Sequence, residues 1–227
     1  MKTFLYTCLL AFLAASSSAS AESCCHMEIA PAFMRIDVLE SGKTVHQANL
    51  LALRAEACYR FCQGFNLKPV LIAAPRCIDK SSLFAGGVAL GHFYPVYKNL
   101  CLNPNFGVTY TIFKTKVTYE LFPIDISLKE EFRSVSPFVG LDVNYSINEC
   151  WRIYASFQYA WSRTHTTVKY LFSTKDHSQG TNWGLAVETD MTEALSVNFG
   201  VGYNLSMSRE KHGIRAFGGK VALAYWY

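Results

Sequence analysis

The stretch that decides the fold is Gly213-Ile-Arg-Ala-Phe-Gly-Gly-Lys-Val-Ala-Leu-Ala-Tyr-Trp-Tyr227. Counted back by twos, one set of positions is mostly large and apolar: Tyr227, Tyr225, Leu223 and Val221, preceded by Gly219. The positions between them hold Trp226, Ala224, Ala222 and Lys220. Because side chains alternate across a strand, this pattern predicts a β-strand with one bulky apolar face. In water such an edge would invite aggregation, whereas a closed transmembrane barrel pairs both edges and turns that face toward lipid.

The N-terminal region predicts export. Lys2 precedes an apolar run at residues 4–15 and then Ala19-Ser20-Ala21, which is the layout of a cleavable secretory signal. We expect cleavage after Ala21, which gives a signal peptide at residues 1–21 and one domain at residues 22–227. The apolar run is too short to span the ~30 Å hydrocarbon core as a helix, and no later run reaches the roughly 18 apolar residues needed. The net charge of +4 is scattered, which gives no case for a nucleic-acid partner.

Ten segments after the signal have strand character. They lie at residues 27–40, 47–61, 65–79, 82–97, 100–118, 133–147, 150–163, 180–191, 194–208 and 213–227. The connections after the second, fourth, sixth and eighth segments are tight, while those at residues 119–132 and 164–179 are long. Short turns on one side and long loops on the other are typical of an up-and-down barrel. Eight strands remain an alternative, because the first segment changes face near Met34, which needs a β-bulge, and two prolines interrupt the third.

The two faces of the later segments separate apolar from small polar residues. In residues 194–207 one face carries Leu195, Val197, Phe199, Val201, Tyr203, Leu205 and Met207. The other face holds Ser, Asn and Gly. A soluble β-sandwich would alternate as well, but here aromatic residues lie near both strand ends, as membrane interfaces require, and small polar residues suit a narrow lumen. The sequence therefore predicts an all-β fold, an antiparallel up-and-down transmembrane β-barrel of about ten strands.

The alternation before the terminal aromatic residue resembles the closing strand of bacterial outer-membrane β-barrels, in which this pattern is the assembly signal. The residues that carry it are Gly219, Val221, Leu223, Tyr225 and Tyr227. In size the chain resembles the opacity-protein and omptin classes of small barrels. The resemblance implies a location in the bacterial outer membrane, with the lipid bilayer and the barrel-assembly machinery as partners. It carries over no catalytic residue, because no family motif that contains one is matched.

Charged residues on the lumen side of the predicted strands form the first candidate site. By side-chain parity they are Arg54, Glu56, Arg60, Asp142, Arg152, Glu188 and Lys220, with Glu28 and Lys68 expected beside them. One interpretation is a network of salt bridges that fills a small lumen, since an unpaired buried charge is costly. The other is a polar pathway for small solutes, although a barrel of this size leaves little free bore.

Cysteines form the second candidate site. The predicted topology places six of the seven in the mature chain at the periplasmic rim: Cys24, Cys25, Cys58, Cys62, Cys101 and Cys150. An exported protein meets an oxidising compartment, and an odd number leaves at least one thiol free or paired with another chain. The pattern resembles bacteria whose envelopes are stiffened by disulfide-linked complexes, which implies other cysteine-rich envelope proteins as partners. Packing of small buried residues is the alternative.

Residues on the predicted outer loops suggest a surface role. His46, His165, His177 and His212 fall there, with Asp176 beside His177. No nucleophile elbow and no telling pair of carboxylates accompany them, so we expect no enzymatic activity, no cofactor and no metal site. The alternation in residues 164–179 indicates that the strands continue as a hairpin. Its exposed edge could bind a partner, and the alternative is that it is simply a variable, polar outer loop. The predicted function is a structural or surface-interaction barrel, with a narrow channel and an outer-rim hydrolase as alternatives.

Overall fold

The computed structural model describes residues 25–61, 64–76, 78, 80–121, 124–168 and 172–227. The predicted signal peptide at residues 1–21 lies outside the described residues, as do Cys24, Cys62 and Cys77. Within the described ranges, no helical segment has the length and apolarity that crossing a bilayer requires.

The sheet closes on itself. Its strands are β1 (Cys25–Glu40), β2 (Lys43–Arg60), β3 (Phe65–Ala74), β4 (Ser82–His92), β5 (Tyr94–Tyr97), β6 (Leu100–Leu121), β7 (Ile124–Ser146), β8 (Trp151–Val168), β9 (Phe172–Asp190), β10 (Leu195–Ser208) and β11 (Gly213–Trp226). Neighbours pair antiparallel, β1 pairs with β11, and pairing of β4 with β6 completes the circle. Because β4 and the short β5 both pair with β6, the barrel has ten strands. The predicted fold class is confirmed.

The predicted loop at residues 119–132 is wrong. Strand β6 continues to Leu121 and β7 begins at Ile124. The two strands pair without a break from Leu121 opposite Ile124 to Lys114 opposite Glu131. Residues 115–128 include two Thr, one Val, one Tyr, two Ile and one Phe, which favour strands, and this preference outweighs the charged residues among them. The hairpin expected in residues 164–179 is present, since β8 reaches Val168 and β9 begins at Phe172.

Strand β1 has no change of face near Met34, contrary to the prediction. Its even-numbered residues from Glu28 to Val38 point inward, and its register with β2 shifts only after that, between Val38 and Leu39. Arg35 and Asp37 share the outward face with Ile29, because this part of β1 lies above the apolar band. In β3, the pairing with β2 skips Pro69, which has no N–H to offer to the ladder.

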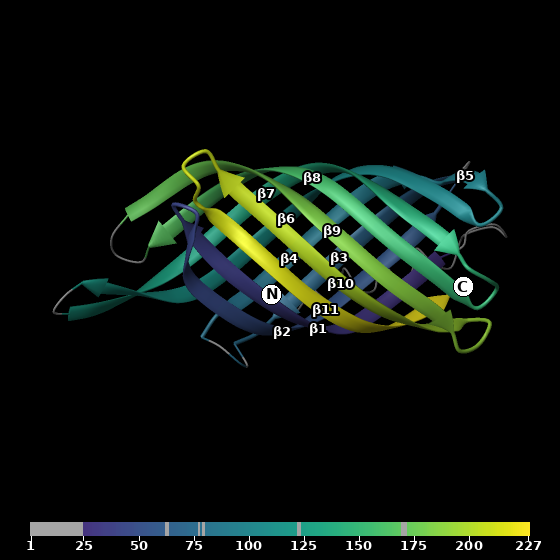
Figure 1. Cartoon of the computed structure of the whole chain (residues 1–227), viewed down its shortest axis with the longest axis horizontal. Coiled ribbons are helices and arrows are strands. Elements are labelled where there is room, and N and C mark those ends of the chain that lie inside the picture. Colours follow the sequence, from purple (N-terminus) through teal and green to yellow (C-terminus); the bar gives the residue numbers. More distant parts are fainter. Residues whose placement is uncertain (1–24, 62–63, 77, 79, 122–123, 169–171) are drawn as a thin grey trace, which may run out of the picture.

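The two ends of the barrel differ. Figure 1 shows the long hairpins β6–β7 and β8–β9 at one end, and β5 and the chain's C-terminus at the other. We call the hairpin end the outer end and the opposite one the periplasmic end. At the outer end β1 and β2 are joined by a two-residue turn in which Ser41 and Gly42 both have positive φ, as hairpin turns matching strand twist require.

The interior is divided into two zones. Toward the outer end, apolar side chains of β1, β2, β4 and β6 pack together, with Leu50 and Phe113 almost fully buried. The rings of Phe113 and Phe132 stack with centroids 5.9 Å apart. Toward the periplasmic end the inward side chains include charged residues and amides, such as Glu28, Asp142 and Asn103, among small residues such as Ala222 and Ala224. The apolar zone was not expected from the sequence, and it closes part of the outer lumen by packing.

Candidate functional site

The periplasmic half of the lumen holds a network of paired charges. One bridge crosses the lumen, because Lys68 of β3 and Asp142 of β7 lie on strands separated by β4 and β6. The ammonium Nζ lies 2.7 Å from Oδ2 of the carboxylate. The amide of Asn103 donates to the same oxygen at 3.2 Å, and Asn66 donates to Asn103 at 2.9 Å. The carboxylate therefore has two donors from different strands.

A second group of charges lies on β1, β2 and β11. Glu28 and Glu56 are directly opposite one another in the β1–β2 ladder. Two carboxylates this close repel, and each is balanced by its own cation. Arg54 donates to Glu56 from two residues away, and Lys220 of β11 donates to Glu28. Both ion pairs are largely shielded from solvent.

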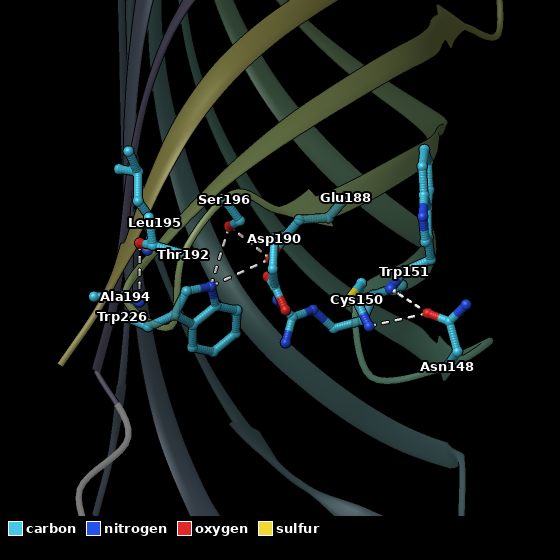
Figure 2. Close-up of polar contacts among 11 residues, drawn as sticks. Asn148, Cys150, Trp151, Glu188, Asp190, Thr192, Ala194, Leu195, Ser196 and Trp226 are labelled. Carbon is cyan, nitrogen blue, oxygen red and sulfur yellow. Dashed lines mark hydrogen bonds and ion pairs between the residues drawn. The ribbon is translucent and has the colours of Figure 1, made fainter.

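A third group lies around Glu188, whose side chain is fully buried (Figure 2). Arg152 pairs with Glu188 at 3.0 Å and also with Asp190. Ser196 Oγ donates to Glu188 Oε1 at 2.9 Å, and the indole N–H of Trp226 reaches the same oxygen at 3.2 Å. The guanidinium of Arg152 lies 4.9 Å from the centre of the Trp226 ring. One carboxylate on β9 thus contacts side chains from three other strands at the periplasmic rim.

Polar side chains also hold the turns at this rim in place (Figure 2). Asn148 Oδ1 accepts from the backbone N–H groups of Cys150 at 2.9 Å and Trp151 at 2.8 Å. Thr192 Oγ1 accepts from the N–H of Leu195 at 3.0 Å. These local bonds satisfy backbone donors that have no strand partner, so the tight turns position β8 and β10 beside the Glu188 group.

Eight of the nine residues predicted on the lumen side take part in ion pairs: Glu28, Arg54, Glu56, Lys68, Asp142, Arg152, Glu188 and Lys220. Arg60 instead places its guanidinium 4.3 Å from the centre of the Phe93 ring. The prediction missed the amides of Asn66 and Asn103, and it omitted Asp190 although parity already put that residue on the lumen face. The described inward side chains of this half carry equal numbers of cations and carboxylates.

The described cysteines lie near the periplasmic end. Cys58 and Cys101 point inward and are half-buried, whereas Cys150 is exposed in the turn between β7 and β8. All three are free thiols. Cys25 begins β1, but its side chain lies outside the described part of the chain, as do Cys24 and Cys62.

The outer-end histidines do not form a hydrolytic site among the described residues. His212 Nε2 is 3.9 Å from Glu210 Oε2, beyond hydrogen-bond distance, and both are exposed. His46 contacts Thr115 Oγ1 at 2.7 Å, and that hydroxyl contacts Ser81 Oγ at 2.7 Å, but both hydroxyls are buried. His177 and Asp176 are neighbours in β9 and therefore point to opposite faces. No described group of His, Cys, Asp and Glu is arranged to hold a metal ion.

The outward surface is apolar across the middle of the barrel. Exposed side chains include Ile29 and Phe33 on β1, Leu185 on β9, and Val221 and Leu223 on β11. A protein in water does not expose a continuous apolar belt of this size, whereas a bilayer solvates it. Among the described strands, closure of the barrel leaves no unpaired edge in this belt. The fold is that of the bacterial outer-membrane β-barrels.

Solved structures of similar fold agree. The outer-membrane protease OmpT from Escherichia coli superposes with a TM-score of 0.57 at 10% identity, over 93% of this chain and 100% of OmpT. The translocator domain of the autotransporter NalP from Neisseria meningitidis gives a TM-score of 0.51 at 8% identity, over 99% and 95%. No protein-family model and no curated protein matches the sequence. At these identities the likeness concerns the fold, and fold and surface together place the chain in the bacterial outer membrane.

Proposed function

We propose that this chain is a closed, non-enzymatic barrel with a structural or surface-interaction role in the outer membrane. The observation that carries the proposal is the bridge of Lys68 to Asp142 across the lumen, which Asn66 and Asn103 extend. Charges that are paired across a narrow lumen leave no low-energy path for a hydrated solute. The long hairpins at the outer end (Figure 1) then offer the surface through which the barrel acts.

Conductance in a planar bilayer tests the closed state. The refolded wild type is expected to give no stable current steps. The double variant Lys68→Ala and Asp142→Ala removes the bridge without changing net charge, and it is expected to give small discrete steps. A matched control is Lys98→Ala with Glu149→Ala, which removes one cation and one carboxylate from exposed turns at the same end. Steady unit currents from the wild type would contradict the proposal.

A narrow channel is the second candidate, and the wall formed by β7 to β10 favours it. Inward hydroxyls there form short ladders, with Ser136 Oγ 2.7 Å from Ser162 Oγ and Ser178 Oγ 2.9 Å from Ser206 Oγ. Such a wall can exchange hydrogen bonds with a polar solute. The two candidates differ in the wild-type bilayer recording, because only a channel conducts before the bridge is removed.

The structural role includes a covalent link to the envelope through Cys150, whose exposed position in the β7–β8 turn supports the proposal. Export through a signal peptide cleaved after Ala21 would bring this thiol into an oxidising compartment. Isolated envelopes run without reductant are expected to show a slower band that Cys150→Ser abolishes. Identical mobility with and without reductant excludes the link.

A further inference from the structure

The outward residues of β8 mark the height of the membrane. From Trp151 to Trp161 every second residue is apolar or aromatic. Ten residues that rise about 3.3 Å each, tilted by about 40°, span roughly 25 Å, the height of the apolar band of a transmembrane barrel. Trp161 therefore lies at the outer interface, since aromatic residues prefer that level. The next outward residues, Arg163 and His165, stand among the lipid headgroups.

The pairing of β6 to β9 collects basic residues on this outward surface. Arg133 is opposite His165, which is opposite Lys175, and Arg163 is opposite His177. One step further out, Lys116 is opposite Lys129. Residues directly opposite in an antiparallel pair have Cβ atoms about 5 Å apart, so their side chains form one surface. We call it the basic face; its residues are Lys114, Lys116, Lys129, Arg133, Arg163, His165, Lys175 and His177.

The described part of the basic face contains a single carboxylate. Glu131 accepts from Arg133 and lies 3.1 Å from Lys114 Nζ. The nearby acids Glu130 and Asp176 belong to the opposite side of the sheet by parity. Arg133, Arg163, Lys175 and His177 are exposed. Like charges directly opposite one another, such as Lys116 and Lys129, destabilise a sheet, so the described cations of this face need a further anion besides Glu131.

A separate groove on the membrane side of β7 to β11 and β1 points to a lipid as the ligand of this outward surface. It has a volume of about 1150 Å³ and follows one row across the sheet, from Leu141 through Phe157 and Trp183 to Arg35 and Arg215. Its walls are mainly apolar and its upper end reaches two guanidinium groups that share Asp37. At the periplasmic end the outward strand residues are aromatic instead, such as Tyr145, Trp151 and Tyr225. The outward basic residues therefore gather at the outer interface of the membrane, and the periplasmic interface has aromatic residues in their place.

We propose that the basic face of β6 to β9 binds phosphate groups of outer-leaflet lipids, and that Arg35 of β1 and Arg215 of β11 bind a further lipid whose acyl chain lies along the groove. Guanidinium groups match phosphate oxygens in a bidentate geometry, and the apolar row below them accepts hydrocarbon. The inference rests on the surface-interaction role proposed above and names its partner as a phosphate-bearing lipid. Bilayer conductance tests only whether the lumen is closed, whereas lipid binding tests only the outward surface. Failure of the proposed function and failure of this inference are therefore distinguishable.

Native mass spectrometry of the barrel in neutral detergent tests the proposal. Dioleoyl phosphatidic acid is expected to bind about tenfold more tightly than dioleoylglycerol, which lacks only the phosphate. The triple variant Arg133→Gln, Arg163→Gln and Lys175→Gln is expected to lose about tenfold in affinity for phosphatidic acid. A matched control, Lys43→Gln with Arg209→Gln and Lys211→Gln, removes the same charge from exposed positions at the start of β2 and in the β10–β11 turn, and is expected to bind as the wild type does.

Three outcomes overturn the proposal. The two lipids bind equally well, which removes the role of phosphate. The control loses as much affinity as the triple variant, which shows that net charge alone matters. Dextran sulfate, a soluble polyanion, binds more tightly than phosphatidic acid and depends on the same three residues, which assigns the basic face to an extracellular polymer. Inorganic phosphate is expected to compete only weakly, because it lacks the acyl chains.

Discussion

The lumen network and the basic face use the same residue types on opposite sides of one sheet. Inside, Lys68 and Asp142 meet at 2.7 Å, and Glu188 has Arg152, Ser196 and Trp226 around it. Outside, the cations of the basic face share Glu131. The difference follows from solvation. A charge withdrawn from water is stable only when another side chain pairs with it, because an unpaired buried charge is costly. A cation at the headgroup level stays solvated and can pair with an anion of the membrane.

The largest expected effect comes from breaking the pairing inside. Replacing Glu188 by Gln leaves Arg152 with Asp190 alone and removes the charged acceptor for Ser196 and Trp226. Breaking a buried pair by removing one partner costs about 3–5 kcal/mol, and we expect the lower value because Asp190 remains. Urea unfolding in detergent micelles measures the loss as a shift of the midpoint.

The control for this substitution is Glu193→Gln, the same chemical change in the exposed β9–β10 turn. Its unfolding midpoint is expected to stay within about 0.5 kcal/mol of the wild type. Equal shifts for the two variants would mean that burial of Glu188 contributes nothing, and the contrast between the two sides of the sheet would fail.

Removing the outward carboxylate should have the opposite outcome. Glu131→Gln releases Lys114 and Arg133 for an incoming phosphate, so the affinity for phosphatidic acid is expected to rise about threefold. Stability should change by less than about 0.5 kcal/mol, because exposed ion pairs contribute little. Native mass spectrometry and urea unfolding report the two values. A fall in affinity would show that Glu131 orients the cations instead of competing for them.

Acidification should reproduce this effect in the wild type. Burial alone would raise the pKa of Glu131, but the hydrogen bonds from Arg133 and Lys114 hold that pKa below its usual value. A carboxyl with a depressed pKa keeps its ion pairs down to a pH under the ordinary range of glutamate, and loses them as pH falls through the folded-state pKa. Acid therefore frees Lys114 and Arg133 only at a pH below the ordinary range of glutamate. The rise in affinity for phosphatidic acid that this release causes in the wild type should be absent in Glu131→Gln.

Side-chain parity was enough to predict the ten strands and the inward position of residues such as Arg54 and Glu188. It follows from local geometry alone. Parity does not choose partners, however. The bridge from Lys68 to Asp142 depends on how the barrel closes, since β3 and β7 are not neighbours. The aromatic partner of Arg60 likewise depends on where β4 gives way to β5.

The errors have physical causes as well. A change of face was predicted at Met34 because Arg35 and Asp37 were assumed to avoid the side of Ile29, and the assumption fails once β1 rises above the apolar band. The prediction of a long loop at residues 119–132 fails because β6 and β7 continue to pair beyond the apolar band, where a strand needs no buried face. The basic face was not recognised because its residues come from four strands and meet only through register.

The smallest expected effect concerns Arg60, the inward cation that contacts a ring. Its guanidinium lies over Phe93 at 4.3 Å, and its Nε atom is buried with no hydrogen-bond partner among the described residues. An attraction of about 0.5–2 kcal/mol to the ring is offset by the cost of desolvating the charge. Met at this position keeps a contact with the ring and carries no charge, so Arg60→Met is expected to leave the urea midpoint unchanged or raise it by up to about 0.5 kcal/mol. A loss of stability as large as that of Glu188→Gln would show that the lumen stabilises a cation without a carboxylate partner. Ion pairing would then no longer explain why the inward cations and carboxylates are equal in number.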